Sequence, residues 1–254
     1  MNSTWFRRYT TAPGNAPRLV CFPHAGGSAT AYKSLALALA PDVDVVSVQY
    51  PGRQDRFGEA PYTSLEPLVE AVSGELARAL AAEPGRPYAL FGHSMGALVA
   101  YETARRLERA ALPAPRRLFA SGRGAPHTRS GAHYRDYGDA DVLAEVRRLS
   151  GTDQRLLDNP EILEMVLPAL RADYRAVGTY TWSGGGPLAT PVTALTGDSD
   201  PMVTLAEARA WREHTTGGFG LEVFPGCHFY LDEQRAGVAS AVVEGLLAPA
   251  AAVS

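Results

Sequence analysis

The chain has 254 residues, of which 46% are hydrophobic and 20% charged, so it contains enough apolar material for a sizeable core. Its formal net charge is -3 with a pI of about 6.1, which excludes the basic surface typical of nucleic-acid or anionic-membrane binding. Two cysteines are too few for a disulfide framework, and we expect Cys227 to act as a small buried hydrophobe. No signal peptide or bilayer-spanning run is visible, so a cytoplasmic location is expected.

Apolar, β-rich segments alternate with helix-like segments along the chain. This alternation is typical of βαβ units and predicts an α/β fold, with a mostly parallel central sheet covered by helices on both faces. Ligand chemistry is then expected beyond the carboxyl ends of the strands. The predicted strands are residues 18–22, 43–49, 88–91, 117–121, 191–196 and 221–224, and the predicted helices are residues 31–40, 65–82, 97–110 and 205–215.

One stretch interrupts the alternation between the fourth and fifth predicted strands. It contains two helix-like segments, residues 140–149 and 160–177, and no convincing strand. The second carries an apolar stripe at helical spacing. We interpret residues 123–186 as an inserted helical lid within a single domain spanning residues 1–254. The alternative is an ordinary crossover helix with a long loop, although long loops without structure are uncommon in compact domains.

The pentapeptide GHSMG at residues 92–96 lies between a predicted strand and a predicted helix. In that context it predicts a nucleophile elbow, a sharp strand-to-helix turn that exposes Ser94 Oγ above the sheet. Gly92 and Gly96 would allow the neighbouring backbones to approach closely. The helix that follows would direct its N-terminal amides toward the charge that develops during acyl transfer. The alternative is a glycine-rich turn that contains a serine by chance.

A serine hydroxyl needs a base within hydrogen-bond reach and a carboxylate that orients the base. Late in the chain, His214 falls on the polar side of a predicted helix, whereas His228 follows a strand and is the predicted base. Asp200 is the predicted acid because it lies further from the preceding strand than Asp198 and can reach toward His228. Asp198 suits a turn in which its side chain bonds local backbone amides.

An acyl-transfer site also needs two amide donors for the oxyanion. We expect the backbone N–H of Met95, directly after the nucleophile, and that of Ala25, in the loop FPHAGG that follows the first predicted strand. A glycine-rich loop of this kind can also cradle a phosphate, but no GxGxxG motif or P-loop lysine accompanies it. His24 and His93 flank the site and are expected to pack or hydrogen-bond there.

The ordered set of motifs resembles the type II thioesterases, stand-alone α/β-hydrolases that accompany polyketide synthases and non-ribosomal peptide synthetases. The resemblance covers roughly residues 18–231 and extends to a family-like segment in the predicted lid. It implies the α/β-hydrolase fold and the hydrolysis of aberrant acyl thioesters on carrier proteins. The motifs are FPHAGG at 22–27, YPGR at 50–53, GHSMG at 92–96, LPALRADY at 167–174, GDSD at 197–200 and GCHFYL at 226–231.

The resemblance further implies acyl or peptidyl carrier proteins as partners, with no bound cofactor or metal, because the substrate itself carries the phosphopantetheine arm. Neither nucleic acid nor membrane is an expected partner, and a monomer is the expected state. Arg53 would serve either in carrier docking or in a structural ion pair. The alternative functions are a carboxylesterase or lipase acting on oxygen esters, a macrocyclising thioesterase domain, and a catalytically silent binding module.

Overall fold

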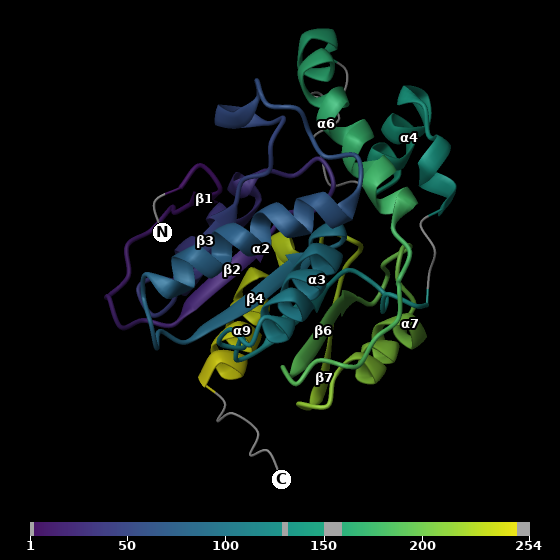
Figure 1. The fold of residues 1–254 in the computed structure, drawn as a ribbon. Helices are drawn as coiled ribbons and strands as arrows, with labels where there is room; N and C mark the ends of the chain where they lie inside the picture. Colours follow the sequence, from purple (N-terminus) through teal and green to yellow (C-terminus); the bar gives the residue numbers. More distant parts are fainter. Residues whose placement is uncertain (1–2, 129–131, 150–158, 248–254) are drawn as a thin grey trace.

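A computed structural model describes residues 3–128, 132–149 and 159–247. Within these ranges seven strands form one sheet in the order β1-β3-β2-β4-β5-β6-β7 (Figure 1). Neighbouring described strands run parallel, except that β1 pairs antiparallel with β3. The strands are β1 (Phe6–Arg7), β2 (Arg18–Phe22), β3 (Asp44–Val48), β4 (Tyr88–His93), β5 (Leu118–Ser121), β6 (Val192–Gly197) and β7 (Phe219–Phe224).

Helices cover both faces of the sheet, because both faces of its strands are apolar. Along β2, Val20 and Phe22 belong to the core shared with α2 and α3, whereas Leu19 and Cys21 belong to the core shared with α1 and α9. Figure 1 shows α2 and α3 in front of the strands and α9 behind them. The bounds of these helices are α1 (Lys33–Leu39), α2 (Leu65–Ala81), α3 (Met95–Arg109) and α9 (Arg235–Leu247).

The connection between β5 and β6 contains the 3-10 turn η3 (Ala132–Asp136) and the helices α4 (Asp139–Leu149) and α6 (Pro160–Thr179). In Figure 1, α4 and α6 stand together beyond α2 and α3. Asn159 caps α6, since its side chain accepts bonds from the first amides of the helix. Residues 129–131 and 150–158 of the predicted lid lie outside the described residues.

Most predicted elements are confirmed, with differences at their ends. Strand β4 continues two residues beyond the prediction and runs directly into the elbow. The helix predicted at residues 205–215 is a short helix, α7 (Leu205–Arg209), followed by the 3-10 turn η4 (Ala210–His214). The prediction missed β1, α9 and the one-turn helix α8 (Tyr230–Glu233).

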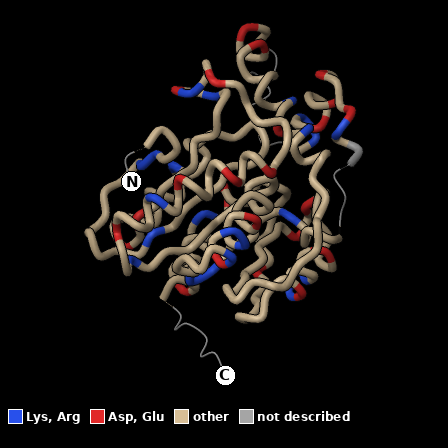
Figure 2. The backbone as a smooth tube through the Cα atoms, viewed as in Figure 1, with Lys and Arg blue, Asp and Glu red and all other residues tan. Residues whose placement is uncertain are grey.

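Acidic and basic residues are interleaved along the helices and loops that Figure 2 shows. Several of them pair at the amino-terminal end of the sheet, where buried Arg18 contacts Asp44 and Glu83, and Arg86 contacts the same two carboxylates. These pairs hold β2, β3 and the end of α2 together. Among the described helices, none is both long enough and apolar enough to cross a membrane.

Candidate active site

Ser94 occupies a strained turn between β4 and α3. Its backbone angles are φ 55° and ψ -116°, a region that a non-glycine residue rarely adopts. The Ser94 amide donates to the Ser121 carbonyl at 2.8 Å, which fixes the turn to the end of β5. A Cβ on Gly92 would overlap the Gly96 backbone, and a Cβ on Gly96 would overlap the Phe22 carbonyl. The structure therefore confirms the elbow geometry and the reason for both glycines.

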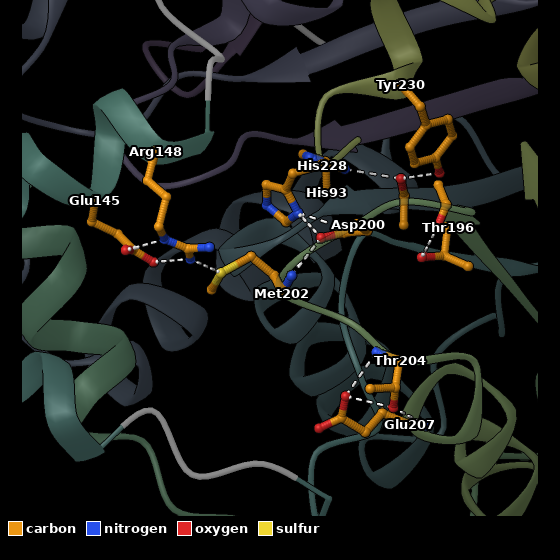
Figure 3. A network of polar contacts seen from close by, with 12 residues as sticks. His93, Glu145, Arg148, Thr196, Asp200, Met202, Thr204, Glu207, His228 and Tyr230 are labelled. Atoms are coloured by element: carbon orange, nitrogen blue, oxygen red, sulfur yellow. Dashed lines mark hydrogen bonds and ion pairs between the residues drawn. The ribbon is translucent and has the colours of Figure 1, made fainter. Parts of the chain in front are cut away.

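His228 and Asp200 are brought together from the ends of two neighbouring strands, as Figure 3 shows. His228 Nδ1 lies 2.9 Å from Asp200 Oδ2 and 3.1 Å from Asp200 Oδ1, and the two side chains are only 2% and 0% exposed. The Met202 amide donates to Asp200 Oδ1 at 2.7 Å and orients the carboxylate further. With Nδ1 facing Asp200, the His228 ring keeps Nε2 for a second partner.

Two competing candidates are occupied elsewhere. His214 is buried rather than on a polar helix face, and its two ring nitrogens contact Tyr101 Oη at 2.8 Å and His127 Nδ1 at 2.7 Å. The prediction of a polar face was wrong because the segment ends in a 3-10 turn that directs His214 inward. Asp198 accepts a bond from the Gly226 amide at 3.1 Å, so it holds the histidine loop rather than only its own turn.

The loop after β2 lies beside Ser94. Two of its amides are bonded, since Gly27 donates to the His24 carbonyl at 2.9 Å and Gly26 donates to Asp173 at 2.8 Å. Within the residues that the structure describes, the Ala25 amide has no such partner. The Met95 amide begins α3, where the first amides have no partner inside the helix. The two predicted oxyanion donors therefore both belong to segments that adjoin the serine.

Ser94, His228 and Ala25 line one cavity of about 70 Å³. The rest of its lining is largely apolar and comes partly from the insertion: Val146 and Leu149 of α4, Leu170 and Tyr174 of α6, and Phe229, together with His24 and Gly26. Such a lining suits an acyl chain attached to a reacting carbonyl. Within the described ranges, no group of three or more His, Cys, Asp or Glu residues is placed to hold a metal ion.

His93 and His24 lie close to His228: the centroid of the His93 ring is 4.9 Å from that of His228 and 6.0 Å from that of His24. Burial, with a smaller contribution from the charge on His228, lowers the pKa of His24 to about 4. Burial lowers the pKa of His93 well below its usual range, and its Nδ1 contacts Ser121 Oγ at 2.9 Å. Ser121 Oγ in turn contacts Tyr230 Oη at 2.7 Å. Both rings are therefore neutral at pH 7, and the packing role predicted for them agrees with the structure.

Two features of the site differ from the prediction or were missed by it. Cys227 is exposed, because the turn before His228 directs it toward solvent, so the prediction of a buried hydrophobe was wrong. The sequence gives no separate role to Asp173 of α6, which lies in the family-like segment LPALRADY. Its carboxylate reaches the loop of Ala25 and also pairs with Arg53. The ion-pair alternative for Arg53 is thus confirmed.

Most of the chain matches known proteins. The family model described as the thioesterase domain matches residues 17–245. A probable cadicidin biosynthesis thioesterase of Streptomyces griseus is 46% identical over 242 residues, which cover 95% of this chain and 66% of that protein. Thioesterase PikA5 of Streptomyces venezuelae is 47% identical over 247 residues, covering 96% of this chain and 85% of the relative.

Among solved structures, the type II thioesterase BorB from the borrelidin biosynthetic cluster superposes with a TM-score of 0.86. It is 46% identical, and the alignment covers 97% of this chain and 99% of BorB. The likeness therefore extends well beyond the motifs that surround Ser94.

Proposed function

The chain belongs to the thioesterase family, and we propose that it removes stalled or aberrant acyl groups from the phosphopantetheine arms of acyl or peptidyl carrier proteins. The family and the α/β-hydrolase fold predicted from the motifs are confirmed, and with them a serine thioesterase activity. Relatives whose names refer to cadicidin and borrelidin biosynthesis support a role in polyketide or non-ribosomal peptide pathways.

The observation that carries the proposed mechanism is that Ser94 and His228 line one cavity while Asp200 contacts His228 Nδ1. His228 Nε2 takes the Ser94 proton while Oγ attacks the thioester carbonyl. Asp200 keeps Nδ1 protonated and stabilises the imidazolium. The C–S bond then breaks, and the protonated His228 returns its proton to the departing sulfur. A thiol, with a pKa of about 8.5, needs less of this assistance than an amine does.

Deacylation repeats the same steps with water. His228 removes a proton from water, which attacks the acyl-Ser94 ester, and the C–O bond to Ser94 breaks. The proton returns to Ser94 Oγ, and the free carboxylic acid leaves. In both steps the Ala25 and Met95 amides donate to the tetrahedral oxyanion, a contribution worth about 3–4 kcal/mol per donor in comparable enzymes.

The insertion has a defined part in this proposal. Its helices α4 and α6 contribute four apolar residues to the cavity wall. We assign residues 123–186 as a lid within one hydrolase domain. The lid shapes the cavity beside Ser94, here called the acyl chamber, and admits the pantetheine arm.

The proposal is tested by steady-state hydrolysis of a short acyl-pantetheine thioester beside the matching oxygen ester. We expect a higher kcat/KM for the thioester, and a loss of at least about 10³-fold in Ser94→Ala, because the nucleophile acts together with its base. His214→Gln is the matched control, since this histidine is buried outside the cavity lining. Equal or faster hydrolysis of the oxygen ester would instead identify a carboxylesterase, and no hydrolysis of either would identify a binding module.

A further inference from the structure

The loop that carries Ala25 is held by the insertion. Asp173, on the inner face of α6, accepts the Gly26 amide at 2.8 Å, although the two residues are 147 positions apart in the chain. Gly26 is the next residue after Ala25. A bond to its amide therefore fixes the peptide plane between the two residues and, through it, the direction in which the loop presents its neighbouring amide.

Arg53 completes the attachment from the other side. Its Nη1 and Nη2 donate to Asp173 Oδ2 at 2.7 Å and Oδ1 at 2.9 Å, a bidentate pair whose side chains are only 8% and 3% exposed. Nη1 also donates to the Gly27 carbonyl at 3.0 Å. The loop is thus held at an amide by the carboxylate and at a carbonyl by the guanidinium.

Arg53 is itself fixed by the core. Gln49, the residue after β3, donates to the Arg53 carbonyl at 2.9 Å, and Arg53 Nε donates to the Pro51 carbonyl at 3.2 Å. Two charged groups buried this fully tolerate little displacement, since either one alone would lack a counter-charge. The pair therefore favours a single arrangement, in which α6 packs against the core.

Packing reinforces the same geometry. Gly26 has φ +75°, and a Cβ at this position would overlap Leu170, which lies one turn before Asp173 on α6. Leu170 also lines the cavity beside Ser94. The position of α6 therefore determines both the wall of the cavity beside Ser94 and the conformation of the loop that carries Ala25.

We propose that Asp173 is a positioning residue for the oxyanion loop, so that α6 of the insertion assembles the Ala25 donor only when Asp173 is paired with Arg53 and Gly26. This rests on the proposed role of Ala25 in acyl transfer. The insertion then has two functions, because it shapes the acyl chamber and also controls how well the enzyme stabilises the tetrahedral oxyanion.

The test variant is Asp173→Asn, which keeps the size of the side chain and removes the charge. Two probes are used that do not depend on the thioester substrate: p-nitrophenyl acetate, and phenylboronic acid, whose boron binds Ser94 Oγ and becomes tetrahedral. We expect kcat for the ester to fall by about 10–100-fold with KM changed less than about threefold, because the loss is confined to the transition state. The Kd of the boronate, measured by calorimetry, should rise by a similar factor.

The control variant is Arg171→Ala, on the same helix. Arg171 pairs with Asp139 of α4 on the exposed side, so its removal weakens the insertion without touching the loop. We expect less than a twofold change in kcat and in the boronate Kd for this variant. An equal loss in Arg171→Ala and Asp173→Asn would overturn the proposal, because it would indicate a general loosening of the insertion.

Because Asp173→Asn leaves Arg53 buried without a counter-charge, the double variant Arg53→Gln/Asp173→Asn is measured in parallel. It contains no unpaired buried charge and is expected to fold, yet it should retain the low kcat and the weak boronate binding. A double variant with the kcat and boronate affinity of the parent would refute the proposal. If the parent protein itself did not hydrolyse the thioester, the proposed function would be refuted. That result would be separate from the test of Asp173, because neither probe is a thioester.

Discussion

At the scale of single residues, the site depends on glycine positions, where no side chain would fit, as well as on the side chains that we propose to react. Gly96 lies where its Cα approaches the Phe22 carbonyl, and that carbonyl also accepts the Tyr32 hydroxyl at 2.8 Å. The loop that carries Ala25 begins directly after Phe22. Any side chain at Gly96 therefore displaces both the elbow and the segment that carries Ala25, the proposed oxyanion donor.

We predict that Gly96→Ala destabilises the protein by about 1–3 kcal/mol, the usual cost of overpacking a close contact, and abolishes most activity. Gly74→Ala is the matched control, because Gly74 lies within α2 and nothing surrounds a Cβ there. That variant should be stabilised by about 0.5–1 kcal/mol, since alanine favours the helix. Urea unfolding of both variants measures the difference, and a Gly96→Ala protein as stable as the parent would contradict the overlap.

The side chains that we propose to react could be picked out from the sequence because their motifs are local. Ser94 is identified by glycines two positions away, His228 by the turn that follows a predicted strand, and Asp200 by its greater distance than Asp198 from the preceding predicted strand. Asp173 and Arg53 were not predictable in the same way. Their contact joins residues 120 positions apart, and no spacing in a single sequence encodes it. Neither does local spacing indicate that Asp198 bonds the Gly226 amide across 28 positions.

At the scale of elements, strands and helices were predicted where their periodicity is strong. The prediction missed α9, whose sequence RAGVASAVVEGLL has two glycines, several β-branched valines and no clear polar face. Its formation depends on tertiary packing, in which Val238 and Val242 lie in the core shared with α1. Strand β1 has only two residues and carries no periodic signal, so its place at the sheet edge follows from pairing with β3.

The helices α4 and α6 define a chamber of limited volume, which leads to a prediction about acyl length. Each methylene group of the acyl chain that is buried in the chamber stabilises the bound substrate and transition state by about 0.8 kcal/mol. This corresponds to a roughly fourfold increase in kcat/KM per methylene until the chamber is full. Leu149 lines the cavity, and its exchange for alanine removes three carbons from the wall. We predict that Leu149→Ala moves the preferred acyl chain toward longer substrates by about three carbons.

The measurement is kcat/KM over a series of acyl-pantetheine thioesters of increasing length. Val142→Ala serves as the control, because Val142 is fully buried on the same helix and is not among the described residues that line the cavity. It should lower stability without moving the preferred length. If Leu149→Ala and Val142→Ala gave the same length profile as the parent, the chamber would not be the determinant of length.

At the scale of the whole molecule, buried titratable groups connect stability to pH. His214 packs between Tyr101, Trp182 and Trp211, and burial lowers its pKa to about 4. His24 is shifted to the same value. At the opposite end of the sheet, burial of Glu83 is outweighed by hydrogen bonds from Arg18 and Arg86, and its pKa falls to about 2. Each of these groups is held in the form that predominates at pH 7.

These shifts predict a continuous loss of stability on acidification. An unfolded histidine binds a proton near pH 6.5, whereas folded His214 and His24 do so only near pH 4. The unfolded state therefore holds more protons across this window, and the free energy of unfolding falls as pH falls, by up to about 1.4 kcal/mol per pH unit for each group. Below pH 4.5, protonation of Glu83 in the unfolded chain extends the loss toward pH 2.

Urea unfolding at intervals from pH 8 to pH 4 measures this slope, and His214→Gln isolates one contribution to it. The variant should lose some stability at pH 7, because the Tyr101 hydroxyl and His127 lose their ring partner. Between pH 6.5 and pH 4, however, the free energy of unfolding of the variant should fall less steeply with pH than that of the parent. The difference in slope should correspond to at most one bound proton, and both curves should be flat above pH 7.5. Parallel curves over the acidic window would mean that His214 takes up its proton equally in the folded and unfolded states, despite its burial among aromatic rings.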